Sequence, residues 1–384
     1  WATLRALEIG CGPGRLMLPM SQRLGEVHGV DVSDEMIRLA GERLHGIPNA
    51  WPRVNSGADL RAFADDFFDF VYSYAVFQHI PSREVVFQYL REARRVLRPG
   101  GLLRCQLNGL ADSPAACNTW SGVNISPDQV SGFALAEDMQ LLALEGVRTQ
   151  YTWVTMRKQP AGWHAELAGR PAGGHCLIRR VTNASGSEPL AACRGRFAAI
   201  SLYVESLPAE CDLLHLEAII GGGRGAPFYI GPPENDGLSQ IGVRLPDGIE
   251  TGLQPVLLNW LDQPLCPPAT LRVVPPGPLV PRLVSVGDAV DLLSGLLIQS
   301  GIVKLVLEDV ERISDLLVFV EGREAPRVET FCVDPAQLLY EVNVHLPKME
   351  PGEHFMQLRL GARRFSPIPI QTVQFRPASS DTGL

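Results

Sequence analysis

Three glycines at alternate positions near the start of the chain constrain its fold more than any other feature. An apolar run typical of a β-strand, Leu4 to Ile9, contains Glu8 and leads into Gly10-Cys11-Gly12-Pro13-Gly14. A helix-compatible run follows. Glycine is favoured where backbone turns sharply or approaches a ligand closely. A strand that turns into a helix N-terminus presents bare N–H groups and a positive dipole end. The sequence therefore predicts a nucleoside-binding loop.

The spacing of the glycines indicates which kind of nucleoside is bound. A dinucleotide fingerprint, G-x-G-x-x-G, would need glycine at position 15 or 17, where the chain has Arg15 and Met17. The observed E-x-G-x-G-x-G resembles the first motif of class I S-adenosylmethionine (SAM) methyltransferases. SAM carries a sulfonium and an amino-acid end but no pyrophosphate, so an acidic residue beside the loop suits it. A nicotinamide oxidoreductase is disfavoured for the same reasons.

Later motifs follow the order expected from this resemblance. The segment Gly25 to Asp31 is typical of a second strand that ends in a carboxylate, and Ser33 is a plausible N-cap for the next helix. In the resembled family the carboxylate accepts hydrogen bonds from the ribose hydroxyls, and Met36 would face the adenine. The resemblance implies that the cofactor-binding residues are Glu8, Gly10, Cys11, Gly12, Gly14, Asp31, Val32, Met36, Ser56, Gly57 and Tyr74.

The rest of the amino-terminal region supports the same fold. Phe68 to Tyr74 resembles the fourth strand of this fold, and Arg83 to Leu97 has apolar residues at helical spacing. Arg98-Pro99-Gly100-Gly101 predicts a turn into a fifth strand. A helix from Pro127 and two strands, Met139 to Leu144 and Gln150 to Arg157, would then close the sheet. We expect a doubly wound, Rossmann-like α/β sheet over residues 1–159.

Two residues near the expected methyl position are candidate catalytic residues. His79 could act as a base if it had a partner, or it could merely line the cavity or cap a helix. Tyr74, which shares a face with Tyr72 on strand alternation, could touch cofactor or acceptor, or pack under the sheet. Asp69 is more consistent with a structural role at the strand start. Trp120 could be an aromatic lid or a buried anchor.

Composition excludes several function classes. The net charge of −8 over 384 residues, without a basic stripe, argues against nucleic-acid binding. No apolar run reaches about 18 residues, so we expect no membrane span. The eight cysteines have no metal-ligand spacing, which predicts no metal site and buried thiols in a reducing cytoplasm. Because the chain starts at Trp1, we expect that an upstream segment has been lost.

The rest of the chain has a different character. After a predicted linker (159–162 and 170–174), short alternating segments lie between clusters of Gly, Pro, Asn and Asp, which is typical of all-β structure. The clearest of these segments are Ala198 to Val204, Leu213 to Ile220, Ile241 to Leu245 and Gln254 to Trp260. Two sequence blocks, beginning at Gln240 and Glu341, resemble each other at an offset of about 100 residues. The proline-rich segment Pro267 to Pro281 falls between the copies.

This repeat resembles two Ig-like β-sandwiches, which we place at 175–275 and 281–375. The spacing of Gly352, His354, Leu358 and Gly361 resembles the end of IPT/TIG-type domains. Neither copy holds a catalytic constellation, which favours a role as a spacer or as a module that binds a protein partner.

The predicted function is SAM-dependent methyl transfer to an O, N or C atom of a small molecule or protein. The alternative is a SAM-binding scaffold without turnover that works through its sandwiches.

Overall fold

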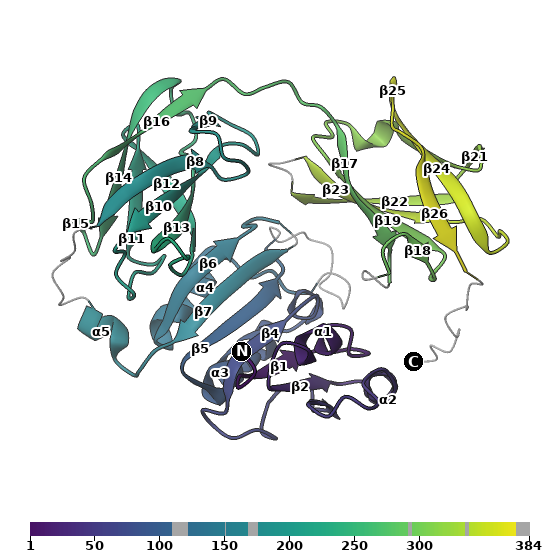
Figure 1. Cartoon of the computed structure of the whole chain (residues 1–384), viewed down its shortest axis with the longest axis horizontal. Coiled ribbons are helices and arrows are strands. Elements are labelled where there is room, and N and C mark those ends of the chain that lie inside the picture. Colours follow the sequence, from purple (N-terminus) through teal and green to yellow (C-terminus); the bar gives the residue numbers. More distant parts are fainter. Residues whose placement is uncertain (110–121, 150, 168–175, 291–293, 335–337, 374–384) are drawn as a thin grey trace. The chain divides into compact units, whose positions relative to one another are not determined.

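The computed structural model describes residues 1–109, 122–149, 151–167, 176–290, 294–334 and 338–373 (Figure 1). The chain divides into two compact units, Trp1–Pro276 and Gly277–Leu384. The boundary falls inside the proline-rich segment that the sequence places between the two repeats. The finer division into 1–159, 175–275 and 281–375 stays a prediction.

The amino-terminal sheet of the first unit is doubly wound. Its strands are β1 (Arg5–Ile9), β2 (Glu26–Asp31), β3 (Ala50–Val54), β4 (Phe68–Ser73), β5 (Leu97–Leu107), β6 (Met139–Glu145) and β7 (Thr152–Lys158). They lie in the order β3-β2-β1-β4-β5-β7-β6, in which β1 to β5 are parallel and β6 and β7 are antiparallel. The chain moves outward from β1 to β3 and then crosses to β4 on the other side. This confirms the predicted fold and places the point at which the strand order reverses at the carboxyl ends of β1 and β4.

Helices pack on both faces of this sheet. The helices of this part of the chain are α1 (Met17–Ser21), α2 (Asp34–Arg43), the short 3-10 helix η1 (Phe77–His79), α3 (Arg83–Val96), α4 (Pro127–Ala136) and α5 (Trp163–Leu167). Along β1, Ala6 joins one buried cluster with Met17 of α1, while Leu7 joins another with Leu90 of α3. Alternate side chains of one strand therefore supply both cores. The predicted N-cap Ser33 is confirmed, since its Oγ accepts from the Met36 N–H at 3.3 Å.

One local prediction in this region is wrong. Strand β5 begins at Leu97 and runs through the predicted turn, because the chain accommodates Gly100 (φ +81°) by a shift of register opposite Phe68–Phe70 rather than by leaving the sheet. Helix α5 lies between the two segments that are predicted as linker. Trp163 and Leu167, one helical turn apart, are both buried in the core of the β-rich region that follows. Residues 168–175 lie outside the described part.

Both β-rich regions repeat the same pattern of strands. The first contains β8 (Leu177–Asn183), β9 (Leu190–Ala192), β10 (Ala199–Glu205), β11 (Leu216–Ile220), β12 (Gly223–Ile230), β13 (Leu238–Arg244), β14 (Gly252–Trp260), β15 (Gln263–Pro264) and β16 (Ala269–Val274). The second contains β17 (Arg282–Asp288), β18 (Leu297–Ile298), β19 (Ile302–Glu308), the 3-10 helix η2 (Ile313–Asp315), β20 (Leu316–Val320), β21 (Arg323–Glu324), β22 (Arg327–Asp334), β23 (Leu339–His345), β24 (Gly352–Leu360), β25 (Arg363–Arg364) and β26 (Ile368–Thr372).

Pairing within each region confirms the repeat. In the first region β10 pairs with β8 and β13, and in the second region β19 pairs in the same way with β17 and β23. Likewise, β14 pairs with β11 and β16, and its counterpart β24 pairs with β20 and β26. In the second region one buried core takes Leu305 from one sheet and Leu358 from the other, so the two sheets enclose it between them. Strand β11 begins at Leu216, later than predicted, because Asp212 closes a turn by accepting from the His215 N–H at 3.2 Å.

In the part of the chain that the structure describes, the helices are all too short or too polar to cross a lipid bilayer.

Candidate cofactor site

The glycine loop between β1 and α1 is tied to the end of β2. The N–H groups of Gly10 and Cys11 both donate to the Val30 carbonyl, at 2.8 and 2.9 Å, and the Gly12 N–H donates to Asp31 Oδ2 at 2.9 Å. Helix α1 is only five residues long and has no side-chain cap. The prediction of bare N–H groups at the positive end of a helix dipole is therefore wrong at these three positions. The loop folds back onto β2, and acceptors of β2 take up all three N–H groups.

Two glycines of the loop are required for different reasons. Gly10 has φ +74°, and a Cβ placed there would lie 2.2 Å from Cγ2 of Val76. Gly12 has φ +50°, but a Cβ there would meet nothing within 4 Å. Gly10 therefore permits close packing of the loop against the segment after β4. Gly12 keeps backbone exposed on the open side, where a ligand can approach.

Asp31 holds two neighbouring segments together. Besides accepting from Gly12, its carboxylate accepts from the Ser33 N–H through Oδ1 at 3.0 Å, just before α2 begins. A carboxylate offers about four acceptor sites. Asp31 can therefore make these two bonds and still accept from ligand hydroxyls.

Glu8 lies beneath the loop and is 3% exposed. Its Oε2 accepts from the Tyr72 hydroxyl at 3.0 Å. Burial raises the pKa of Glu8 to about 8, although the Tyr72 hydrogen bond acts against this. A cation bound near Glu8 would favour the charged form of this carboxyl. Burial also raises the pKa of the adjacent Cys11 thiol, so Cys11 is an unreactive wall of the loop.

The remaining predicted cofactor contacts lie at the ends of β2 and β3. Val32 is 63% exposed, which is unusual for a valine, and Gly57 packs so closely that a Cβ there would lie 2.9 Å from Val32 Cγ1. The Ser56 hydroxyl donates to Asp59 Oδ2 at 3.2 Å. Asn55, which the sequence analysis missed, fixes this turn by accepting from the Gly57 N–H at 3.3 Å. Asn55 also donates to the Tyr89 hydroxyl at 3.0 Å.

The two candidate catalytic residues follow β4. Tyr74 is 36% exposed and stacks on Trp153 of β7, with ring centroids 5.8 Å apart. The next residue, Ala75, has φ +56°, and its N–H donates to Gln106 Oε1 at 2.9 Å, so the chain turns sharply here. His79 lies in η1, with Nε2 3.3 Å from Nε2 of Gln78. Asp69 accepts from the Arg5 N–H at 2.7 Å, consistent with a structural role. Trp120 lies outside the described residues.

Comparison with known proteins places this site in a known family of domains. Residues 7–105 match the family described as "Methyltransferase domain". The ubiquinone biosynthesis O-methyltransferase of Xanthomonas oryzae pv. oryzae is 34% identical over 118 residues, which are 30% of this chain and 46% of that protein. Phosphoethanolamine N-methyltransferase 2 of Caenorhabditis elegans is 34% identical over 105 residues, which are 27% of this chain and 23% of that protein. The chain thus spans half or less of the length of these relatives.

A solved structure is also similar to part of the chain. A SAM-dependent methyltransferase from Methanosarcina mazei is 20% identical, and the match covers 41% of this chain and 94% of that protein with a TM-score of 0.34. The family match therefore gives the segment from β1 to β5 the sequence pattern of a methyltransferase domain.

The two glycines give a first prediction. Gly12→Ala should destabilise the chain by roughly 1–2 kcal/mol, the cost of a left-handed backbone for an L-residue. Gly10→Ala adds a collision with Val76 and should cost clearly more. Urea unfolding of both variants measures this difference. The double variant Gly10→Ala/Val76→Ala should be less destabilised than the sum of its two single variants, and strict additivity would contradict the proposed collision.

Glu8 gives a prediction about pH. Its pKa rises from 4.5 to about 8 on folding, so the folded chain holds the Glu8 proton more tightly than the unfolded chain. The associated stability is fully present below about pH 4.5 and is lost as pH rises through about 8. Glu8→Gln cannot ionise, so its melting temperature should fall less between pH 5 and 9 than that of the wild type.

The control for this pH experiment is Glu35→Gln, which changes an exposed carboxyl whose pKa is lowered by its hydrogen bond with Arg38. Its titration lies below this pH window, so it should follow the wild type. Parallel curves for Glu8→Gln and wild type would show that Glu8 is not the buried acid described above.

Proposed function

We propose that this chain is an S-adenosylmethionine-dependent methyltransferase that acts on an O, N or C atom of a small molecule or protein. The observation that carries the proposal is the glycine loop fastened to Asp31 at the crevice of a doubly wound sheet. The family match over residues 7–105 covers this loop and the four strands after it.

The residues of the crevice suit each part of this cofactor. Asp31 has remaining acceptor capacity for two ribose hydroxyls. Exposed Val32 and the neighbouring Met36 offer apolar surface for an adenine ring. Glu8 is buried in the strand that leads into the loop, and a nearby ammonium or sulfonium group would favour its ionised form, whose charge would in turn hold that end of the cofactor. Ser56 and Gly57 border the Val32 side of the crevice.

When bound, SAM supplies a methyl group on a sulfonium that is already activated for in-line displacement. The chain's own task is then to align the acceptor and exclude water. Tyr74 is positioned for this by its stack on Trp153 and by the turn at Ala75. His79 follows on η1, and we assign it to the acceptor side as a proton acceptor or cavity wall.

The acceptor is left open for a physical reason. Relatives named for methylation of oxygen and of nitrogen are each 34% identical to a part of this chain. The shared segment holds the glycine loop and Asp31, whereas acceptor pockets are built from loops that vary between such proteins.

We further propose that both β-rich regions are Ig-like β-sandwiches, over 175–275 and 281–375, which bind a protein partner. Their repeated strand pairing and, in the second region, a core enclosed between two sheets support this. The cysteines among the described residues are free thiols, which supports a cytoplasmic location.

Titration of the full chain with S-adenosylhomocysteine tests the cofactor site. Asp31→Ala should weaken binding by roughly 1–3 kcal/mol, because charge-assisted hydrogen bonds to the ribose are lost. The matched control is Asp34→Ala, an exposed carboxylate three residues later in the first turn of α2, which should bind like the wild type. Equal affinity of Asp31→Ala and wild type in calorimetry would remove Asp31 from the ribose role.

Transfer of a labelled methyl group from SAM into cell extract tests the activity itself. We expect labelling by the wild type and a loss of labelling in Asp31→Ala. Tight binding of S-adenosylhomocysteine without any transfer would instead favour the scaffold without turnover.

A further inference from the structure

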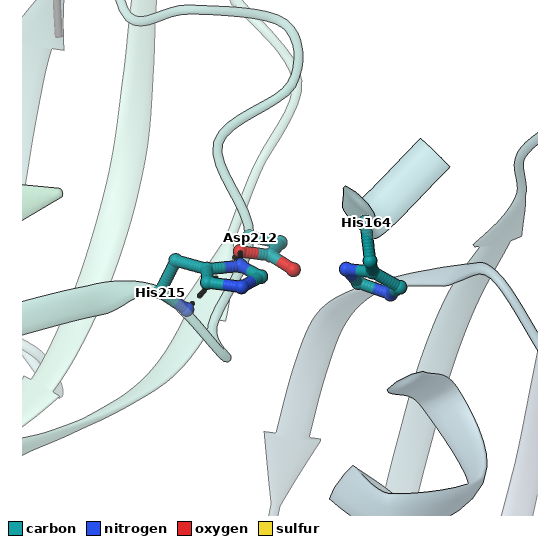
Figure 2. Close-up of side chains that lie close together, drawn as sticks. All are labelled: His164, Asp212 and His215. Carbon is teal, nitrogen blue, oxygen red and sulfur yellow. Dashed lines mark hydrogen bonds and ion pairs between the residues drawn. The ribbon is translucent and has the colours of Figure 1, made fainter. Parts of the chain in front are cut away.

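Two histidines and an aspartate from distant parts of the sequence meet beside strand β6. Within the described part of the chain, His164, Asp212 and His215 form a group whose possible ligand atoms all lie within 4.8 Å of one another. His164 belongs to α5, and the other two belong to the turn before β11. Figure 2 shows the His164 ring and the Asp212 carboxylate facing each other across a short gap.

The group contains buried polar atoms without partners. Asp212 is 0% exposed, and its Oδ1 accepts from both the N–H and Nδ1 of His215, the latter at 2.8 Å. Its other oxygen, Oδ2, is buried without a hydrogen bond, and so is Nδ1 of His164. Burying an unpaired carboxylate oxygen is costly, so a cluster of this kind calls for a further partner between these atoms.

Hydrogen bonds on the outer side fix the tautomer of His164. Its Nε2 lies 3.2 Å from the Ala134 carbonyl and 3.3 Å from the Met139 carbonyl, so Nε2 must carry the hydrogen. In the neutral ring this leaves a lone pair on Nδ1. His215 presents Nδ1 to the cluster, 2.8 Å from Asp212 Oδ1, and an ion between them would replace this hydrogen bond once the His215 hydrogen lies on Nε2. Histidines that bind metals use one nitrogen and donate from the other to a carbonyl or carboxylate.

We propose that His164 Nδ1, Asp212 and His215 bind a divalent transition-metal ion, with zinc as the best match. Two imidazoles and one carboxylate suit zinc and its neighbours better than magnesium or calcium. Ligand atoms on a tetrahedral zinc ion lie roughly 3.4 Å apart, so the cluster needs to contract only slightly. A water molecule completes the fourth position. This site departs from the sequence analysis, which predicted no metal.

The surroundings give this ion a structural role. Asp138, between α4 and β6, holds α5 by accepting from the Gly162 and His164 N–H groups at 2.8 and 3.2 Å. From the other side, the Leu213 N–H donates to the Leu141 carbonyl of β6 at 2.9 Å. The fully buried Gln140 donates to the Cys211 carbonyl at 3.0 Å. The ion would therefore fasten the turn before β11 to α5 and to the edge of the sheet.

Zinc binding to the full chain, after removal of bound metals with a chelator, tests this proposal. We expect uptake of one ion per chain and a melting temperature that rises with zinc. His164→Ala and Asp212→Asn should each weaken binding by more than about 100-fold, since loss of even an outer partner of a metal ligand typically costs 10–100-fold. His45→Ala, an exposed histidine after α2, is the control and should bind like the wild type.

Cobalt as a probe separates this site from the cysteines. Ligation by nitrogen and oxygen gives visible d–d absorption without a thiolate charge-transfer band, and Asp212→Asn should abolish that signal. Absence of uptake by the wild type, a thiolate band, or unchanged binding in both variants would overturn the proposal. If His164→Ala does not fold, the test rests on Asp212→Asn, because that variant keeps the size of the side chain. The result is independent of the proposed methyl transfer, because neither readout uses SAM.

Discussion

The carboxylate of Asp31 makes the hydrogen bonds on which the rest of the candidate cofactor site depends. It accepts from Gly12 in the loop after β1 and from Ser33 before α2, so one side chain sets the distance between two segments that diverge from neighbouring strands. The Val30 carbonyl adds two more hydrogen bonds to the same loop. With its N–H groups used internally, the loop offers shape and an open face at Gly12 rather than a row of donors. That property suits a ligand without phosphates.

Beneath this loop the chain buries a group that opposes its own stability. Glu8 is desolvated under the loop and holds its proton up to about pH 8, at a cost to the folded state at higher pH. Buried acids with raised pKa values cluster at functional sites. A positively charged ligand near Glu8 would favour the ionised form of this carboxyl. Binding of such a ligand would therefore offset the cost of burying the Glu8 charge in the free protein.

The β6 edge of the sheet joins the amino-terminal sheet to the β-rich region within the first unit. Strand β6 would be an exposed edge, but the turn before β11 and the single β12 pairing of Tyr229 with Ala143 cover it. The group of His164, Asp212 and His215 lies at this junction, and the cofactor loop follows β1, with three strands between β1 and β6 in the sheet. A structural ion there would act on the join between the sheet and the β-rich region and not on the methyl-transfer chemistry.

The sequence by itself determined the doubly wound sheet, the glycine loop with Asp31, the N-cap Ser33 and the repeat of the β-rich regions. These follow from local rules of spacing, periodicity and glycine placement, which act over one or two elements. Tertiary structure alone decided that the loop donors are used internally, that α5 forms between the two predicted linker segments, and that His164 meets Asp212. Each of these depends on a contact between residues far apart in the chain, such as Gly12 with Asp31 or Trp163 with the β-rich core. Local pattern carries no information on such contacts, because their energy appears only when the elements pack.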